Sequence, residues 1–190
     1  MTCRLAFALA LAATGCDASL GGGGGGGGDA AIADGRVQDS RAIDVPIDGR
    51  TCMGGNAAAF APDGSCLVHV LTPATYAVAK FSCGQMMAGG HLAYLKTAQL
   101  DTFAETFIGA VDTWVGGNDL VTETAFAWDD GTAFSFTNWH TGEPNNGGGG
   151  AYQEDCVIVA GTRIDKQWDD RPCDASEVAG SGNFAYLCQY

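Results

Sequence analysis

The sequence predicts an α+β fold, in which two helices pack on a small antiparallel sheet. Two segments carry apolar residues at helical spacing, one between residues 72 and 89 and one at residues 98–110. Short apolar segments typical of strands stand before, between and after them, and the last, at 184–189, returns the end of the chain to the first helix. Elements of these two kinds pack in layers around one core.

The first helix is predicted to begin at Thr72, whose hydroxyl would serve as the N-cap, with Pro73 in the first turn. A predicted strand at residues 66–71 precedes it, after a turn at Pro62-Asp63-Gly64. The apolar residues at helical spacing are Tyr76, Ala79, Cys83 and Met86. The helix is expected to end at the Gly89-Gly90 pair.

The second half of the domain is expected to consist of strands separated by long loops. Residues 91–95 predict a buried strand before the second helix, which spans 98–110. Further strands are predicted at residues 157–160, 166–168 and 184–189. Trp128 and Trp139 are interpreted as packing residues, and His69 as a residue packed within its strand.

The first fifteen residues are typical of an export signal. One arginine precedes an apolar run, residues 5–13, that is too short to span a membrane. The residues before Cys16 resemble a bacterial lipoprotein cleavage box, although Ala13 stands where a larger aliphatic residue is usual. We expect residues 1–15 to be a signal peptide and Cys16 to carry lipid, which would anchor the chain to the outer membrane or the cell surface of a bacterium. Ordinary signal-peptidase cleavage, leaving a free thiol, is the alternative.

Residues 16–51 predict a disordered tether. They contain eight consecutive glycines, at 21–28, followed by Asp, Ala and Arg with isolated Val and Ile and no apolar periodicity. Such a segment cannot bury enough apolar surface to offset the entropy of ordering it. The folded domain is therefore expected at residues 52–190.

Eight cysteines indicate a disulfide-bonded, exported domain. Cys3 would leave with the signal peptide and Cys16 would take the lipid. The six that remain are Cys52, Cys66, Cys83, Cys156, Cys173 and Cys188. An even set in an exported chain favours disulfides over metal binding, and six cysteines allow fifteen pairings that spacing alone does not resolve.

The net charge of −13 excludes some partners and favours others. Phosphate backbones and anionic membrane surfaces would be repelled, so nucleic acid is not an expected partner. Much of the acidity lies in the predicted loops between residues 138 and 173, which carry Glu143, Asn145, Glu154, Asp155, Asp169 and Asp170. Carboxylate and amide oxygens on irregular backbone suit Ca²⁺ better than zinc or copper. The alternative is a solvated acidic loop without a metal.

The tripeptide Glu143-Pro144-Asn145, the Glu154-Asp155-Cys156 sequence and the Trp168-Asp169-Asp170 sequence resemble the C-type lectin-like domain, in the form with an EPN sugar site. The resemblance covers residues 52–190 and implies the long form of the domain. It implies one calcium ion bound by Glu143, Asn145, Glu154, Asp169 and Asp170. It also implies disulfides between Cys83 and Cys188, between Cys156 and Cys173, and between Cys52 and Cys66.

The same resemblance implies a cis peptide bond before Pro144 and a sugar bound directly to the calcium ion. Residues Glu143, Asn145, Glu154 and Asp169 would contact the sugar, and glycans with equatorial 3- and 4-hydroxyls would be preferred, as in mannose, N-acetylglucosamine and glucose. The family usually has Asn where this chain has Asp169. A carboxylate at 169 binds calcium but cannot donate a hydrogen bond to a sugar hydroxyl, and such a loss costs about 1 to 3 kcal/mol.

A second calcium site is implied by the segment Asn118 to Glu123, which resembles the family's auxiliary calcium loop. Asp119 and Glu123 would join Glu154 and Asp155 there. The chain has Asn146 where another Asp is common, and its glycine loop is longer than usual.

These observations predict a calcium-dependent carbohydrate-binding surface lipoprotein with a role in adhesion. The alternative is a calcium-stabilised adhesin or interaction domain that binds protein and no sugar, and a third possibility is a structural lipoprotein with a degenerate site. An enzyme is not expected, because nucleophile-elbow, zinc-protease and phosphate-loop motifs are missing from the sequence. Paired carboxylates also hydrolyse glycosides in some enzymes, but here their cysteine neighbours favour metal binding.

Overall fold

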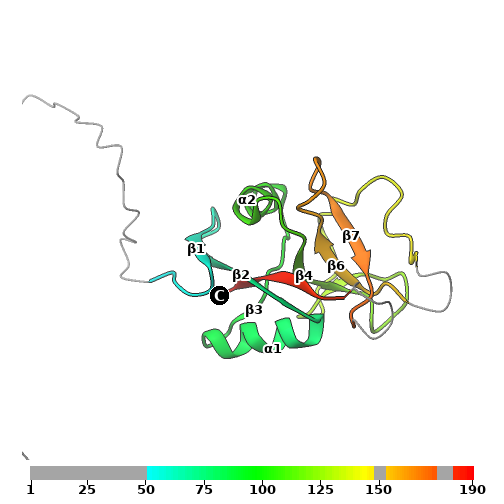
Figure 1. Cartoon of the computed structure of the whole chain (residues 1–190). Helices are drawn as coiled ribbons and strands as arrows, with labels where there is room; N and C mark the ends of the chain where they lie inside the picture. Colours follow the sequence, from blue (N-terminus) through cyan, green and yellow to red (C-terminus); the bar gives the residue numbers. More distant parts are fainter. Residues whose placement is uncertain (1–50, 148–152, 175–181) are drawn as a thin grey trace, which may run out of the picture. The chain divides into compact units, whose positions relative to one another are not determined.

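The computed structural model describes residues 51–147, 153–174 and 182–190 (Figure 1). The predicted signal peptide, Cys16 and nearly all of the predicted tether lie outside these residues, so the structure does not test them. Within the described ranges, the helices are too short or too polar to cross a membrane.

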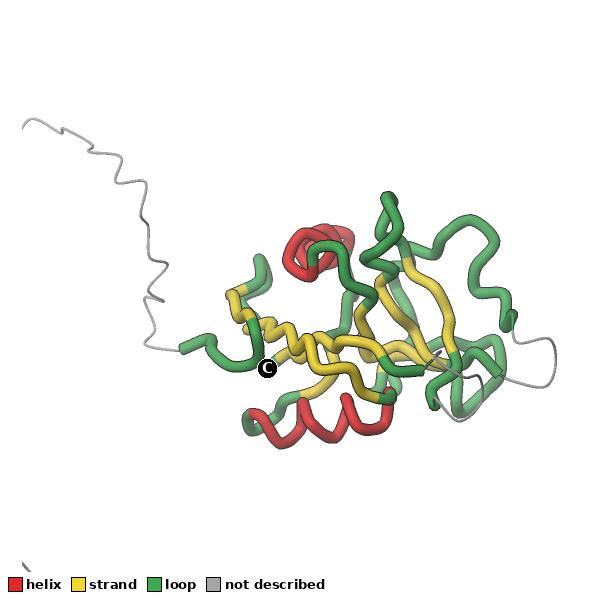
Figure 2. Tube along the Cα trace, in the orientation of Figure 1, coloured by secondary structure: helices red, strands yellow, loops and turns green. Residues whose placement is uncertain are grey.

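The described residues form two helices and eight strands, which confirms the predicted α+β fold. Figure 2 shows how these elements follow one another along the chain. In chain order these elements are β1 (Ala57–Phe60), β2 (Cys66–Ala74), α1 (Tyr76–Met86), β3 (His91–Leu92), α2 (Ala98–Ile108), β4 (Thr113–Asn118), β5 (Ala127–Trp128), β6 (Cys156–Val159), β7 (Trp168–Arg171) and β8 (Phe184–Gln189).

The sheet is mixed, whereas the sequence predicted an antiparallel one. Its order is β1-β2-β8-β4-β6-β7, with β3 also paired to β8 and β5 to β4. Strand β8 lies between β2 and β4, and it runs antiparallel to β2 but parallel to β4. The last strand of the chain thus lies inside the sheet and joins β1 and β2 on one side to β4, β6 and β7 on the other.

Helix α1 begins later than predicted. Thr72 and Pro73 belong to β2, which stays paired with β8 as far as Ala74, across an irregularity after Val70. A proline is tolerated at such an irregularity because no ladder hydrogen bond is required of it there. The N-cap is Thr75, whose hydroxyl accepts a hydrogen bond from the amide of Val78 at 3.4 Å.

Other boundaries differ from the predicted ones by a few residues. Helix α2 ends at Ile108 because Gly109 takes a positive φ of 67°. The predicted strand at 91–95 is reduced to His91–Leu92, although Leu95 is buried. Strand β7 begins at Trp168, so Asp169 and Asp170 lie on a strand and not on a loop.

The two helices lie on opposite sides of β2 and β8 (Figures 1 and 2). Successive residues of β8 point to opposite faces of the sheet. Cys188 belongs to the core cluster that includes residues of α1, and Leu187 belongs to the cluster that includes residues of α2. His69, Trp128 and Trp139 pack within this core or against it, as predicted.

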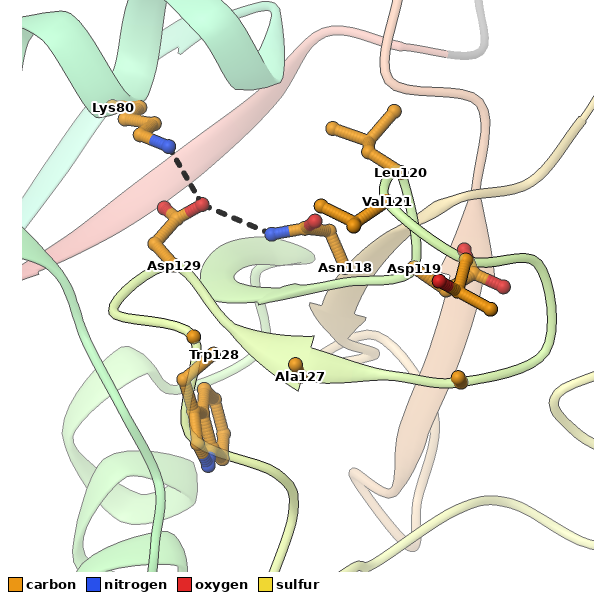
Figure 3. Close-up of a pocket in the computed structure, with 11 residues that line it drawn as sticks. Lys80, Asn118, Asp119, Leu120, Val121, Ala127, Trp128 and Asp129 are labelled. Atoms are coloured by element: carbon orange, nitrogen blue, oxygen red, sulfur yellow. Dashed lines mark hydrogen bonds and ion pairs between the residues drawn. The ribbon is translucent and has the colours of Figure 1, made fainter.

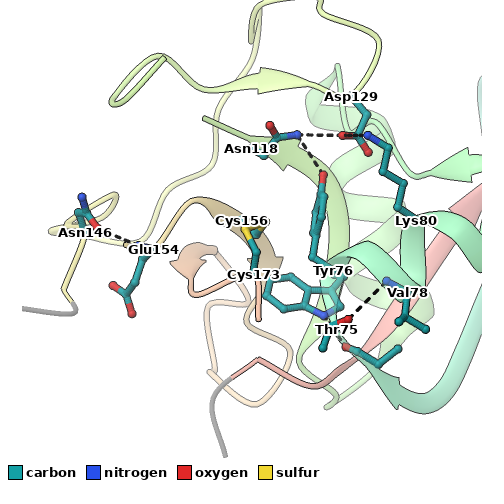
Figure 4. The surroundings of a disulfide bond; sticks show 12 residues. Thr75, Tyr76, Val78, Lys80, Asn118, Asp129, Asn146, Glu154, Cys156 and Cys173 are labelled. Atoms are coloured by element: carbon teal, nitrogen blue, oxygen red, sulfur yellow. Dashed lines mark hydrogen bonds and ion pairs between the residues drawn. A yellow bond between two sulfur atoms is a disulfide. The ribbon is translucent and has the colours of Figure 1, made fainter. Parts of the chain in front are cut away.

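Three disulfides join Cys52 to Cys66, Cys83 to Cys188, and Cys156 to Cys173, which confirms the pairing that the family resemblance implied. The first holds the segment before β1 to β2, and the second fastens α1 to β8. The third joins the start of β6 to the residues just after β7 (Figure 4). Acidic residues predicted to bind metal precede both of its cysteines. Glu154 and Asp155 stand directly before Cys156, and Asp169 and Asp170 stand shortly before Cys173.

Candidate calcium and carbohydrate site

The principal acidic cluster consists of Glu143, Asp169 and Asp170, whose carboxylate oxygens lie within 4.8 Å of one another. Asp169 and Asp170 come from β7 and are 0% and 1% exposed. Glu143 comes from the loop that precedes Pro144, and its peptide bond to that proline is cis, as expected. The structure therefore brings together three of the five ligands predicted for one calcium ion.

The loop carrying Glu143 is held against β7 by its backbone. The amide of His140 donates to the carbonyl of Trp168 at 2.9 Å, and the amide of Trp168 donates to the carbonyl of Asn138 at 2.7 Å. Helix α2 contributes Asp101, a buried carboxylate that accepts from the indole of Trp168 at 2.7 Å and from the side-chain amide of Asn138 at 2.8 Å. The core thus fixes where the loop meets the strand.

Asp170 orders the segment that follows Pro144. Its two carboxylate oxygens accept hydrogen bonds from the backbone amides of Asn145 at 3.1 Å and Asn146 at 2.8 Å. The next residue, Gly147, donates its amide to the carboxylate of Glu154 at 2.5 Å. A side chain at 147 would collide with Oδ1 of Asn145 and come within 2.9 Å of Oε2 of Glu154. Asn145 and Glu154, the other two predicted ligands, therefore converge at Gly147.

Two arginines that the sequence analysis did not assign pair with Asp169. Its Oδ2 accepts from the guanidinium of Arg163 at 2.6 Å and from that of Arg171 at 2.6 Å. Arg171 also approaches Glu154, with 3.6 Å between Nη1 and Oε1. Alternation along β7 places Asp169 and Arg171 on one face of the strand, so this pattern could have indicated Arg171. No pattern in the sequence indicated Arg163.

Two buried carboxylate oxygens of the principal cluster have no hydrogen-bond partner in the described part of the chain. Among the described residues, Oε2 of Glu143 and Oδ1 of Asp169 are buried and accept no hydrogen bond. Burial raises the pKa of Glu143, and the charges of Asp169 and Asp170 raise it further. Burial likewise raises the pKa of Glu154 and of Asp169, although the two arginines oppose the rise at Asp169. Buried polar atoms are normally paired, so these oxygens fit a bound cation, and an all-oxygen donor set fits calcium.

A second acidic cluster joins Asp119, Glu123 and Asp155, whose carboxylate oxygens also lie within 4.8 Å of one another. Asp119 follows β4, and its Oδ2 accepts from the amide of Thr124 at 2.8 Å. Its Oδ1 is buried and, in the described part of the chain, accepts no hydrogen bond. Burial raises the pKa of Asp119 to about 6, and the charges of Asp155 and Glu123 contribute. This cluster contains three of the residues predicted for an auxiliary ion.

Asn146 connects the two clusters, a role that the sequence analysis did not foresee. Its side-chain amide donates to Oε1 of Glu123 at 2.6 Å and to Oε1 of Gln153 at 2.5 Å. Its side-chain oxygen accepts from the backbone amide of Glu154 at 2.8 Å (Figure 4). Glu154, predicted to serve both ions, is therefore linked to both clusters.

A hollow of about 390 Å³ lies beside the second cluster, between α1 and the β4–β5 hairpin (Figure 3). Asp129 lines it and pairs with Lys80 at 2.8 Å, and Asn118 donates to the same carboxylate at 2.9 Å. Leu120 and Val121 also line it and are largely exposed.

Comparison with known proteins identifies the fold family. The family model "Lectin C-type domain" matches residues 72–179. An alpha-N-acetylgalactosamine-specific lectin from Patiria pectinifera is 35% identical over 136 residues, which cover 67% of this chain and 74% of that protein. The low affinity immunoglobulin epsilon Fc receptor of Mus musculus is 38% identical over 95 residues, which cover 50% of this chain and 26% of the receptor.

Among solved structures, the carbohydrate-recognition domain of the mouse scavenger receptor C-type lectin superposes with a TM-score of 0.61 at 23% identity. The superposition covers 73% of this chain and 98% of that domain. The fold is thus that of a C-type lectin domain, and the chain belongs to the C-type lectin family.

Proposed function

We propose that this protein binds carbohydrate through a calcium ion held by Glu143, Asn145, Glu154, Asp169 and Asp170. The observation that carries the proposal is the principal cluster itself, in which Oε2 of Glu143 and Oδ1 of Asp169 are buried without a hydrogen-bond partner among the described residues. Such oxygens are costly to bury unless a cation or a proton satisfies them. A calcium ion would supply a positive charge with open coordination positions, and two neighbouring sugar hydroxyls would fill those positions.

The residues around the ion would orient the sugar. Carboxylates accept hydrogen bonds from hydroxyls, and the amide of Asn145 donates to a hydroxyl oxygen. The order Glu143-Pro144-Asn145 supports a preference for equatorial 3- and 4-hydroxyls, as in mannose, N-acetylglucosamine and glucose. The N-acetylgalactosamine-specific relative makes galactose-type sugars the informative competitors.

Calorimetric titration with calcium, followed by methyl mannoside, tests this proposal. We expect mannoside binding that requires calcium and disappears in EDTA. Exchanging the tripeptide ligands, Glu143→Gln with Asn145→Asp, should shift the preference from mannose towards galactose. Sugar binding that persists in EDTA would reject the proposal.

A second calcium ion is proposed at Asp119, Glu123 and Asp155, with Glu154 linked through Asn146. Its support is the buried Oδ1 of Asp119 and the mutual repulsion of the three carboxylates. Its role would be structural, because it would neutralise the loop between β4 and β5. The calorimetric titration should then show two ions per chain.

The second candidate function is calcium-stabilised binding of a protein ligand without sugar. The pairing of Asp169 with two arginines favours it, since Asp169 then lacks a free oxygen for a hydroxyl beyond the one facing the ion. A relative named as an immunoglobulin receptor also supports it. Millimolar mannose that displaced the protein ligand would argue against this candidate.

We also propose that the domain is displayed on a bacterial surface by lipid on Cys16. The support is the sequence of residues 1–16 alone. Replacing Cys16 by Ser should release the protein from the membrane fraction and abolish incorporation of labelled palmitate.

A further inference from the structure

We propose that Arg171 is a sugar-contacting residue that supplies the hydrogen-bond donor missing from Asp169. The inference rests on the proposed function, because it concerns the sugar that would bind at the same calcium ion. It assigns the hydroxyl nearest Glu154 and Asp169 to a guanidinium in place of a side-chain amide.

Arg171 lies between two residues that are predicted to contact the sugar, Asp169 and Glu154. Its Nη2 donates to Oδ2 of Asp169 at 2.6 Å, and its Nη1 lies 3.6 Å from Oε1 of Glu154. A separation of 3.6 Å is too long for a hydrogen bond. Nη1 therefore lies near the carboxylate of Glu154 and makes no hydrogen bond to the described part of the chain.

The side chain of Arg171 is more exposed to solvent than those of the two carboxylates beside it. The Arg171 side chain is 32% exposed, whereas the Asp169 side chain is 0% exposed and that of Glu154 is 10% exposed. A sugar hydroxyl that approaches these two carboxylates from solvent would therefore meet the guanidinium. A guanidinium has five N–H donors and no acceptor, so it complements the oxygen of a hydroxyl.

Asp169 cannot donate a hydrogen bond to a sugar hydroxyl. Its Oδ2 accepts from both Arg163 and Arg171, and its Oδ1 is the buried oxygen left for the ion. A carboxylate has no donor, so a hydroxyl bound by Glu154 and the ion would lack a hydrogen bond to its oxygen. Arg171 provides one from the adjacent position.

The two arginines also balance part of the negative charge at the proposed calcium site. Glu143, Glu154, Asp169 and Asp170 carry four negative charges, and Arg163 with Arg171 carries two positive ones. The net negative charge that remains on these side chains is the charge that one calcium ion would neutralise. The arginines thus allow a carboxylate at position 169 without leaving excess negative charge beside the sugar. The expected ligand is therefore a neutral sugar with two adjacent hydroxyls.

The experiment compares calcium and methyl mannoside affinities of the full chain and its variants by calorimetry. Arg171→Met should weaken mannoside binding about tenfold or more, the effect of losing a hydrogen bond from a charged group, while calcium binding persists. Arg171→Lys keeps the charge but cannot reach both carboxylates, so it should recover only part of the loss. Asp169→Asn combined with Arg171→Met should restore mannoside binding, because the amide then donates.

Two controls separate donation from charge and folding effects. Lys166→Met removes a positive charge from the segment before β7, where the ammonium donates to the backbone carbonyl of Glu105. Arg163→Met removes the other guanidinium from Oδ2 of Asp169 and should weaken mannoside binding less than Arg171→Met does. Unfolding temperatures measured in EDTA verify that each variant folds without relying on the ion.

The outcomes distinguish this inference from the proposed function. Failure of the unaltered chain to bind mannoside in calcium would reject the proposed function and this inference together. Normal binding by the unaltered chain, with equal losses in Arg163→Met and Arg171→Met or with full recovery in Arg171→Lys, would reject the inference alone, because Arg171 would then only neutralise Asp169.

Discussion

The two acidic clusters are built differently, although each gathers three carboxylates within the same 4.8 Å. The principal cluster takes Asp169 and Asp170 from a buried strand, and guanidiniums balance part of its charge. In the second cluster Asp119 follows β4 directly, and Glu123 lies on an exposed loop. The backbone therefore fixes the first cluster more firmly than the second. We infer that the first is organised for recognition and that the second depends more on its ion.

Removing one ligand of the principal cluster should produce the largest effect. Glu143→Gln is the informative variant because the carboxylate of Asp170 also orders backbone, whereas Oε2 of Glu143 faces the cluster without a described partner. We expect calcium affinity at this site to fall by about a hundredfold and mannoside binding to disappear. Calorimetry measures both, with Asp63→Asn, in the turn before β2, as the control for a lost acidic residue. Unchanged calcium binding would place the ion elsewhere.

Removing calcium should have the next largest effect. An ion that binds only the folded state, at a hundred times its dissociation constant, adds about 2.7 kcal/mol to the free energy of unfolding. We expect EDTA to remove a contribution of that size, measured by chemical denaturation. Glu143→Gln should retain the part that the second cluster supplies. Identical curves with calcium and with EDTA would show that neither cluster binds the ion.

A change in the second cluster should affect the sugar site less. Asp119→Asn is expected to lower the number of calcium ions bound from two to one. Mannoside affinity measured in saturating calcium should change by about twofold, because the sugar would contact only the ion of the principal cluster. Calorimetric stoichiometry measures the first quantity and sugar titration the second. A mannoside loss as large as that in Glu143→Gln would show that the two clusters act as one site.

The smallest expected effect is a pH dependence in the metal-free protein. The pKa of Asp119 is raised to about 6, so the folded state binds this proton more tightly than the unfolded state does. Its contribution to stability is complete below about pH 4 and is lost as the pH rises through about 6. In EDTA the unfolding temperature should therefore fall between pH 5 and pH 7, and Asp119→Asn should reduce that slope. A slope unchanged by the substitution would contradict this assignment.

Local sequence signals predicted most of the elements. Apolar spacing located both helices, and strand β8 was predicted with its observed bounds. The first helix was placed too early because Thr72-Pro73 is a good helix start on local grounds. Pairing between β2 and β8, which are more than a hundred residues apart in sequence, overrides that signal.

The residues of the two acidic clusters were predictable because they stand in short motifs, whereas their partners depend on the tertiary structure. Asp169 carries no sequence signal that Arg163, from the turn before β7, will contact it. Asn146 was noted only as a departure from an expected Asp, yet it links both clusters. The disulfide pairing followed from family resemblance and not from spacing, since fifteen pairings were equally compatible with six cysteines.

The link through Asn146 has a thermodynamic consequence for the two proposed calcium ions. One side chain touches Glu123 of the second cluster and the backbone of Glu154 beside the first, so ordering it serves both sites. Whichever ion binds first would restrict this shared side chain, and the other ion would then bind at a smaller entropic cost. Calcium uptake should therefore show a Hill coefficient above one, and Asn146→Ala should make the two binding events independent.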